Sequence, residues 1–383
     1  VFRAGLAAFL VFSLASAAAP NFLSLLVFRT LQAVSGAILI PNGMGMLREA
    51  VPAARFGRFS GFNSAIVGGT AAAGPVLGGA IIAIGPWRWM FLANVPVVIA
   101  ALALSTRLAG RGGSPGARAR VDWLGVALFA GVLFLVTALL NDLRGDNPAL
   151  AAGGFAGLAV VGALFAWRQA RTTAPAAEWR LFRERSFVGA SSHILLMNLA
   201  MYTTLLAVPF FLTDVQHRSS TAAGLLLGCM AALQAIIAPF AGGFGDSVGR
   251  RAVTLASSLV ALVGTVVLTA GISTDMPLPF LAGVMLVLGG GVGMGFVSAA
   301  TAAIEAAPRA LSASAAGTQS MMRYFGSIVG AGVLSGLLDT HGAAPGIGTF
   351  RLLFLVVTVM VALSLPMALL VRPFAADSRT SES

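Results

Sequence analysis

The chain has 383 residues, of which 58% are hydrophobic and only 10% are charged. Soluble proteins carry about 25% charged residues, so a soluble fold of this composition would expose much of its apolar surface to water. The net charge of +11 does not indicate a nucleic-acid-binding protein, because all 24 basic residues are arginine and most lie in short gaps between apolar runs. The composition therefore predicts a membrane protein that crosses the bilayer many times.

Twelve apolar runs are long enough to cross a bilayer, which takes about 20 mostly apolar residues. In lipid each run must satisfy its own backbone groups, so we expect helices and an all-α polytopic fold. The predicted spans are 2–19, 22–47, 58–84, 88–106, 122–141, 149–167, 187–213, 221–244, 252–272, 278–304, 312–338 and 350–371.

The arginines predict the orientation of these spans. If the first run starts inside the cell, the inner loops and the tail hold seventeen arginines and the outer loops hold four. Cytoplasmic loops carry the excess of basic residues, so we expect both termini in the cytoplasm. Trp87 and Trp89 then lie at an outer turn, where aromatic side chains anchor a helix to the membrane interface.

Two predicted inner loops differ from the others. Residues 107–120 are rich in glycine and arginine, and residues 168–186 are longer and mixed in charge. We interpret the second loop as the hinge between the halves of the protein. Its segment "EWRLFRERSF" is expected to form either a short amphipathic helix on the membrane surface or a solvated linker.

An internal repeat links the two ends of the chain. The stretch "EAVPAARFGRFSG", from Glu49, matches "EAAPRALSASAAG", from Glu305. With a constant offset of 256, the matching residues are Glu49, Pro52, Gly61 and Gly74 with Glu305, Pro308, Gly317 and Gly330. Internal repeats are typical of transporters in which two halves move around a shared central site.

The offset also predicts the domain organisation. It joins the third run to the eleventh, eight helices apart, whereas two equal six-helix halves would give six. We therefore expect a bundle at 1–106 that lacks its first two helices, two inserted helices with linkers at 107–186, a six-helix bundle at 187–371 and a tail at 372–383. The chain would then be an N-terminally truncated fourteen-helix protein. The alternative is a complete twelve-helix protein with a cropped start, for which the offset is a coincidence.

Several short motifs, in this order, resemble those of one family. "RTLQAVSGA" is similar to R-x-x-Q-G-x-G-A, "TAAAGPVLGG" to g-x-x-x-G-P-x-x-G-G, and "GGFGDSVGRRAVTL" to G-x-L-a-D-r-x-G-r-k. The matching positions are Arg29 and Gln32; Gly74, Pro75, Gly78 and Gly79; and Gly242, Asp246, Gly249 and Arg250. The departures are Ala33, Ser35, Thr70, Phe244 and Ser247. The chain resembles the major facilitator superfamily, and within it the fourteen-helix drug:proton antiporters of the EmrB/QacA type.

The resemblance implies proton-coupled efflux of small hydrophobic or cationic compounds by alternating access. The alternatives are export of one endogenous metabolite, such as an antibiotic or a siderophore, and an inactive truncated remnant. We expect a monomer in the plasma membrane whose partners are a small-molecule substrate, protons and the lipid bilayer, with no nucleic acid, no metal and no cofactor. The chain has no HExxH motif, no paired carboxylates and no Ser-His-Asp candidate, so we do not expect an enzyme.

The glycines of the 70–79 motif have a physical explanation. Gly74 and Gly78 are four residues apart and share a helix face, where a neighbouring helix can approach closely. Pro75 removes a backbone donor and favours a kink. The resemblance implies that this segment helps to close the outer side of the transporter, and a static packing face is the alternative.

Two arginines lie within predicted spans, where a charge costs at least about 2.5–3.5 kcal/mol without a cavity or a partner. Arg29 and Gln32 share a helix face, and the resemblance implies a role in proton coupling. Snorkelling of Arg29 to the interface is the alternative. For Arg323 we weigh a cavity position against a role in helix packing.

The remaining candidates divide into a gate and a substrate path. We expect Asp246 just before the next helix, paired with Arg250 as a cytoplasmic latch or as a simple capped turn. His193, Asn198, Tyr202 and Gln319 are candidates for the substrate path or for interior polar contacts. A separate group of methionines suits either an adaptable apolar pocket or ordinary packing: Met197, Met201, Met230, Met321 and Met322.

Acidic residues are absent from the centres of the predicted spans. The resemblance implies an aspartate in the family's first helix, which this chain lacks. We therefore expect the proton carrier to lie in the missing part, so that this chain by itself does not couple transport.

Overall fold

The computed structural model describes residues 2–50, 66, 70, 74, 77–108, 122–141, 148–172, 178–308, 311–338 and 345–373. Within these residues every regular element is helical. The chain divides into two compact units, one of residues 1–70 and 74–119 and the other of residues 71–73 and 120–383.

Among the described residues, nine helices are long and apolar enough to cross a membrane, and Phe2–Ala17 and Trp89–Ser105 are shorter apolar segments. The predicted all-α polytopic fold is confirmed. Eleven of the twelve predicted runs coincide with helices, and the other, 58–84, lies largely outside the described residues.

In the first unit, α1 (Phe2–Ala17) packs against α2 (Phe22–Ala50), α4 (Trp89–Leu92) and α5 (Asn94–Leu108). The single helix predicted at 88–106 is interrupted at Ala93. The proline at position 96 explains the break, because its nitrogen cannot donate to the carbonyl of Leu92. Ser13 connects α1 to α4, because its Oγ donates to the carbonyl of Phe91 at 2.9 Å.

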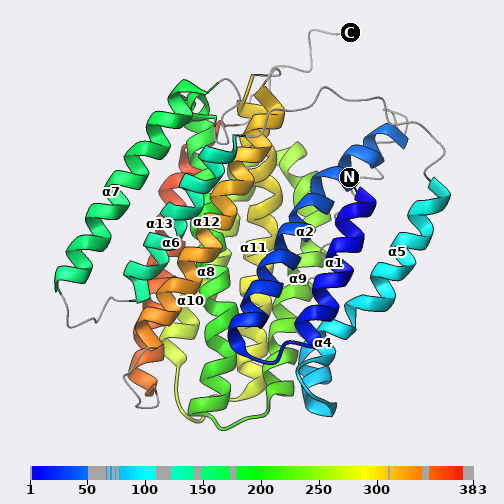
Figure 1. The fold of residues 1–383 in the computed structure, drawn as a ribbon. Helices are drawn as coiled ribbons and strands as arrows, with labels where there is room; N and C mark the ends of the chain where they lie inside the picture. The colour runs from blue at the N-terminus through cyan, green and yellow to red at the C-terminus, as the bar shows by residue number, and fades with distance from the viewer. Residues whose placement is uncertain are drawn as a thin grey trace. The chain divides into compact units, whose positions relative to one another are not determined.

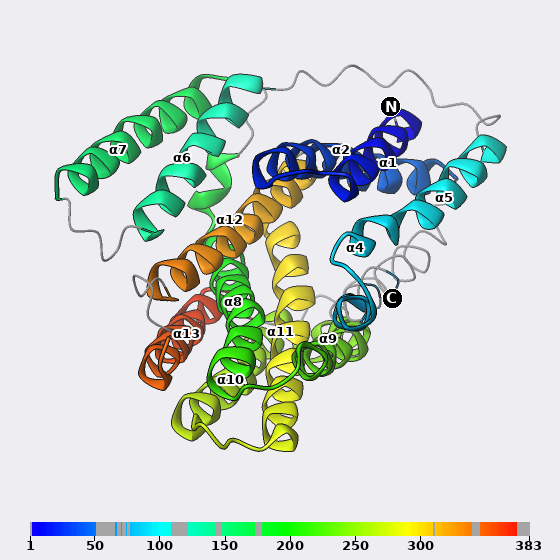
Figure 2. The ribbon, with the colours of Figure 1, turned by 60° about the horizontal axis from the view of Figure 1, so that its bottom comes forward.

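The second unit contains a bundle of six long helices, shown in Figures 1 and 2. They are α8 (Arg185–Phe210), α9 (Ser220–Val248), α10 (Arg250–Gly271), α11 (Leu278–Ala306), α12 (Ser312–Leu338) and α13 (Ile347–Leu369). The helix α11 is central, in contact with α8, α9, α10 and α12. It approaches α9 and α10 closely at glycines: a Cβ on Gly293 would lie 2.6 Å from the carbonyl oxygen of Gln234, and one on Gly291 would lie 2.8 Å from the nitrogen of Ala261. Small residues that admit a neighbouring backbone in this way are the usual means of packing helices in lipid.

A helical hairpin precedes this bundle in the same unit. It is formed by α6 (Trp123–Asn141) and α7 (Pro148–Arg171), and α6 packs on α12 (Figure 1). Only 6% of the most apolar stretch of α6 and none of that of α7 is buried, so the hairpin presents most of its apolar surface outward, as expected for helices that contact lipid. A short 3₁₀ helix, η1 (Trp179–Arg183), leads into α8. It lies in the segment "EWRLFRERSF", for which a short helix was one of the two predictions.

The repeat is visible in the helix bounds and contacts. The helices α2 (Phe22–Ala50) and α11 (Leu278–Ala306) have 29 residues each, and both of their ends differ by the offset of 256. The contacts of α1 with α2 and α5 correspond to those of α10 with α11 and α13. Of the repeat positions, Pro52 and Gly61 lie outside the described residues. The predicted domain boundaries remain predictions.

Asp122 joins the start of α6 to the last part of α7. Its Oδ1 accepts hydrogen bonds from the nitrogen of Gly125, at 3.0 Å, and from Nε of Arg168, at 3.1 Å. The backbone N–H of Gly125 is the main reason why the pKa of Asp122 lies below its ordinary value of 3.8, and Arg168 acts in the same direction against the opposing effect of burial. The ionised carboxylate therefore both caps α6 and pairs with α7.

We expect Asp122→Asn to lower the thermal unfolding temperature by a few degrees at neutral pH and to make no difference in strong acid. Asparagine keeps the capping oxygen but loses the ion pair. Because the folded-state pKa is depressed, the carboxylate's contribution is complete above the unfolded pKa of about 3.8 and is lost as the pH falls through the folded value. Unfolding followed by tryptophan fluorescence in detergent measures this. If the difference in unfolding temperature between the two proteins were the same at every pH, the stabilising role of the Asp122 carboxylate would be contradicted.

Candidate functional site

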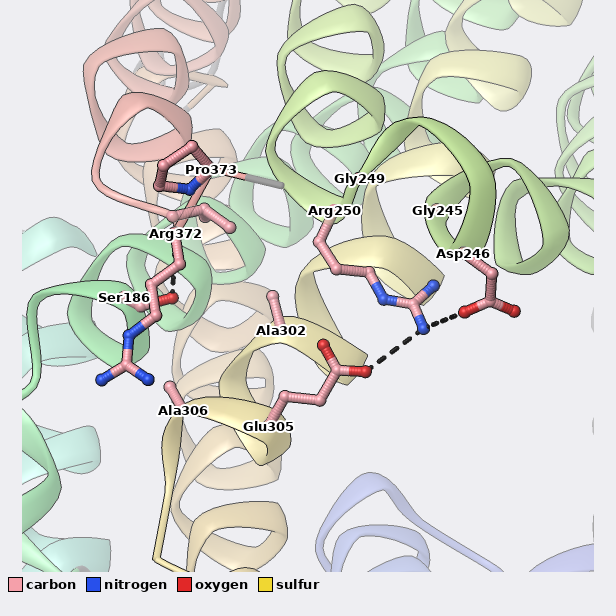
Figure 3. Close-up of a pocket in the computed structure, with 11 residues that line it drawn as sticks. Ser186, Gly245, Asp246, Gly249, Arg250, Ala302, Glu305, Ala306, Arg372 and Pro373 are labelled. Atoms are coloured by element: carbon pink, nitrogen blue, oxygen red, sulfur yellow. Dashed lines mark hydrogen bonds and ion pairs between the residues drawn. The ribbon is translucent and has the colours of Figure 1, made fainter. Parts of the chain in front are cut away.

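An ionic cluster lies where α9, α10 and α11 meet at one end of the bundle. Arg250, the first residue of α10, donates from Nη2 to Oδ1 of Asp246 at 2.5 Å and to Oε1 of Glu305 at 3.2 Å (Figure 3). Its Nη1 donates to the carbonyl of Gly242 at 3.1 Å. The side chain of Arg250 is 16% exposed, whereas those of Asp246 and Glu305 are 65% and 54% exposed. One largely buried cation thus holds two carboxylates that remain open to water.

Two glycines, Gly249 of the motif and Gly245, shape this geometry. Gly249 has φ of 94°, a left-handed backbone that favours glycine, and it ends α9 so that α10 begins at the next residue. A Cβ on Gly245 would collide with Nη1 of Arg250, so a larger residue there would displace the guanidinium from its present position.

The structure corrects the predicted position of Asp246. We expected it just before a helix, but it lies in the last turn of α9, which runs on to Val248. The helix continues through Gly242 and Gly245 because each residue keeps its backbone hydrogen bond until the positive φ of Gly249 ends the ladder. The pairing with Arg250 is confirmed by their hydrogen bond.

A cavity of about 370 Å³ opens beside the cluster. Its lining includes Arg250 and Glu305 on one side and Ser186 and Arg372 on the other (Figure 3). Ser186 accepts from the backbone nitrogen of Arg372 at 3.1 Å, and Arg372 pairs with Glu184 at 3.0 Å. The start of α8 and the segment after α13 are therefore joined to each other on the side of the cavity opposite Arg250.

A second polar layer lies deeper in the bundle. His193, on α8, is fully buried, with Nε2 3.4 Å from Oγ of Ser257 and Nδ1 3.3 Å from Oγ of Ser258. The hydroxyl of Ser364, on α13, lies 2.8 Å from that of Ser258. The absence of a side chain on Gly295 leaves room for the imidazole. His193 thus joins α8, α10 and α13, and its role in a substrate path remains a prediction.

The other path candidates lie on α8 and α12. Asn198 donates from Nδ2 to the carbonyl of Arg323 at 2.6 Å and to Oγ of Ser327, so it ties these helices together. The guanidinium of Arg323 lies 5.0 Å from the ring centre of Tyr324. Tyr202 is half-buried and Gln319 is buried. The structure brings Asn198 and Arg323 together. The transport roles of Asn198, Tyr202 and Gln319 remain predictions, as does the role of Arg323.

In the first unit, Arg29 donates from Nη1 to Oε1 of Gln32 at 2.7 Å, and its guanidinium lies 5.3 Å from the ring centre of Phe91. Arg29 and Gln32 share one face of α2, as predicted, and the structure adds a direct hydrogen bond between them. The Nε2 atom of Gln32 is buried without a hydrogen-bond partner among the described residues. A polar atom left in this state costs about 1–3 kcal/mol, so the pair is not a simple stabilising contact.

Part of the 70–79 motif is described. A Cβ on Gly74 or Gly78 would meet no atom within 4 Å among the described residues, and Gly79 lies in the helical segment 77–84. Pro75 lies outside the described residues. The role of these glycines in closing the protein remains a prediction.

Sequence reasoning missed two groups in these sites. Glu305 was identified as a repeat position but was not predicted to be a partner of Arg250. Its place in the repeat was the one feature of the sequence that singled it out. The serines around His193 carried no signal, because they are spread over α10 and α13 and only the fold brings them together.

A family model described as "Major Facilitator Superfamily" matches residues 1–170 and 190–383. The chain belongs to the major facilitator superfamily. Its helices are therefore those of a multi-pass membrane transporter and not of an enzyme, as predicted. The finer assignment to the fourteen-helix antiporter branch remains a proposal.

Three curated relatives in this superfamily show the range of names. The chain is 30% identical to "Uncharacterized transporter YebQ" of Escherichia coli, over 89% of this chain and 75% of the relative. It is 29% identical to "Multidrug resistance protein B homolog" of Mycobacterium tuberculosis, over 88% of this chain and 63% of the relative. It is 28% identical to "Tetracenomycin C resistance and export protein" of Streptomyces glaucescens, over 89% of this chain and 63% of the relative. The chain thus spans less than two thirds of the last two.

Among solved structures, a POT family transporter in complex with 5-aminolevulinic acid matches with a TM-score of 0.66. The match covers 96% of this major facilitator chain and 80% of the other, at 14% identity. At this identity the likeness shows the shared fold alone.

Proposed function

We propose that this major facilitator protein is an exporter that couples proton entry to the efflux of small hydrophobic or cationic compounds. The observation that carries the proposal is the match, over most of the chain, to relatives named for multidrug resistance and for antibiotic resistance and export. The assignment to the fourteen-helix antiporter branch follows the motifs at Arg29, Gly74 and Gly242.

The distribution of arginines supports an orientation with the ionic cluster in the cytoplasm. Within the described part of the second unit, the end that carries Arg250 also holds Arg168, Arg171, Arg180, Arg183, Arg185, Arg251 and Arg372. The opposite end of this unit holds Arg218 and Arg351. An excess of basic residues marks the cytoplasmic side, so we place the Arg250 cluster and Arg372 inside the cell. A cytoplasmic N-terminus follows from the arginine count of the sequence alone.

In this scheme the Arg250 cluster is a cytoplasmic latch. Asp246 and Glu305 are each more than half exposed, so water can replace Arg250 as their partner at a small cost. A contact of this kind can form in one state of the transport cycle and open in another. Arg29 and Gln32 are proposed to take part in proton coupling, because a charge on a membrane-spanning helix is costly and marks functional sites.

Inside-out membrane vesicles test this proposal when they carry the protein as its gene encodes it, because the sequence predicts a proton-carrying carboxylate outside this chain. We expect an inward-acid pH gradient to drive uptake of a fluorescent cationic dye, uptake to vanish when an ionophore collapses the gradient, and Arg29→Gln to abolish it. Thr30→Ala, which alters an exposed neighbour on α2, is the matched control and should retain uptake. Gradient-independent uptake, or equal activity of the two variants, would refute the coupling scheme.

A second candidate is export of a single metabolite made by the cell, such as an antibiotic. The relative named for tetracenomycin C resistance and export favours it. A panel of chemically unrelated dyes separates the two functions, because a drug exporter should move several of them and a dedicated exporter should move none.

A further inference from the structure

An apolar cavity of about 500 Å³ lies between the α6–α7 hairpin and helices α8 and α12. This volume is within the range of small-molecule sites, about 300–1,000 Å³. Aromatic rings line the cavity from four elements: Phe129 on α6, Phe165 on α7, Trp179 and Phe182 on η1 and Phe325 on α12. Met321 and Met322 add flexible apolar surface, as expected for two of the methionines singled out in the sequence.

The two polar side chains in the lining are already engaged. The hydroxyl of Thr318 accepts a hydrogen bond from the nitrogen of Glu178 at 3.0 Å. The amide of Gln169 donates to Oδ2 of Asp122 at 3.5 Å. The cavity therefore offers its occupant apolar contacts and little polar recognition, which suits a hydrocarbon chain.

The rim of the cavity is built by the 3₁₀ helix η1. Because side chains three residues apart eclipse one another in a 3₁₀ helix, Trp179 and Phe182 form one row and Arg180 and Arg183 form the next. The aromatic row lines the cavity, and Leu181, on the third row, is buried against the bundle. The arginine row is exposed, and the guanidinium of Arg183 lies 4.9 Å from the ring centre of Trp179.

The charge around this rim is positive. The described residues from Arg168 to Arg185, with Asp122, include five arginines and three carboxylates. Asp122 pairs with Arg168, and Glu184 pairs with Arg372. Among the described residues, no carboxylate lies within ion-pair distance of Arg180 or Arg183. An apolar cavity with a basic rim, on a hairpin that faces lipid, is complementary to an anionic lipid.

We propose that this cavity binds an anionic phospholipid, with an acyl chain among the aromatic rings and the headgroup on Arg180 and Arg183. The bound lipid fills the space that the hairpin leaves against α12. This site is separate from the Arg250 cluster and does not depend on the identity of the transported compound.

Native mass spectrometry of the purified protein tests the proposal with phosphatidylglycerol and phosphatidylcholine of identical chains. Wild type should retain phosphatidylglycerol preferentially. Arg180→Gln/Arg183→Gln should reduce this preference by up to about 30-fold, since each basic residue near an anionic lipid contributes about 1 kcal/mol. Arg180→Lys/Arg183→Lys should keep most of the preference because it keeps the charge. The matched control, Arg218→Gln/Arg351→Gln, removes the same charge at the opposite end of the unit and should change nothing.

Fluorescence quenching locates the acyl chain of the bound lipid in the wild-type protein. Phosphatidylglycerol with brominated acyl chains should quench Trp179 more than brominated phosphatidylcholine does, and Trp179→Phe should remove this difference. Filling the cavity with Ala166→Phe should abolish the retention of lipid. Equal binding of both lipids by wild type, or an unchanged preference in the glutamine variant, would overturn the proposal. So would an Ala166→Phe variant that loses dye transport but keeps its lipid, because the cavity would then belong to the transported compound.

Discussion

Gly293→Val is expected to remove most of the folded protein from the membrane. Helix α11 is central to the second unit, and at this residue it touches the backbone of α9 directly. A Cβ would lie 2.6 Å from the carbonyl oxygen of Gln234 and 2.9 Å from its Cα, and backbone atoms cannot move aside as a flexible side chain can. We expect a destabilisation of about 3 kcal/mol or more, at the upper end for overpacked cores. The measurements are the monodisperse fraction in detergent and the thermal unfolding temperature.

Gly283→Val is the matched control for this prediction. Gly283 lies in the same helix, and a Cβ there would meet no atom within 4 Å among the described residues. Both variants bear the same cost of placing valine in a helix, so the difference between them isolates the helix contact. Equal yields and equal unfolding temperatures would show that α11 and α9 are not in close contact at Gly293.

Arg250→Gln is expected to reduce transport about tenfold or more while the protein remains folded. The change removes the ionic contacts with Asp246 and Glu305, and glutamine is too short to span both. A tenfold loss corresponds to about 1.4 kcal/mol, which is the size expected for charge-assisted hydrogen bonds. Because both carboxylates are largely exposed, they can be solvated, and the unfolding temperature should change little. Dye uptake by inside-out vesicles gives the rate.

Arg251→Gln controls for the loss of one positive charge at the same place. Arg251 has no ion pair among the described residues, so its replacement should leave the rate within about twofold of wild type. Asp246→Asn and Glu305→Gln each leave Arg250 one partner and should have intermediate rates. If Arg250→Gln and Arg251→Gln are equally active, the cluster has no part in transport.

The helices were predictable because lipid imposes one requirement on every span. Residues 22–47 and 278–304 were predicted from hydropathy alone, and the structure extends them only to Ala50 and Ala306. The end of α9 was harder to predict, because Gly242, Gly243 and Gly245 resemble a loop in the sequence. A helix can pass through them since each keeps its backbone hydrogen bond, and only the left-handed backbone of Gly249 ends it.

The sites were predictable where the partners are close in the sequence. Arg250 lies four residues after Asp246, and Gln32 lies three residues after Arg29, so helix geometry alone suggests both contacts. Contacts across the bundle gave no such signal: the glycines of α11 indicate a close approach but do not say that Gln234 and Ala261 are the neighbours. Glu305, fifty-five positions beyond Arg250, reaches it only because α11 ends beside the start of α10.

The hairpin of α6 and α7 has a consequence for how the chain is threaded through the bilayer. Two antiparallel crossings return the polypeptide to the side from which it left, so their presence or omission does not invert any later segment. A single added crossing would turn the whole following bundle over and move Arg250 and its neighbours to the opposite compartment. Only an even number of crossings at this point of the chain therefore keeps the two faces of the following bundle in their own compartments.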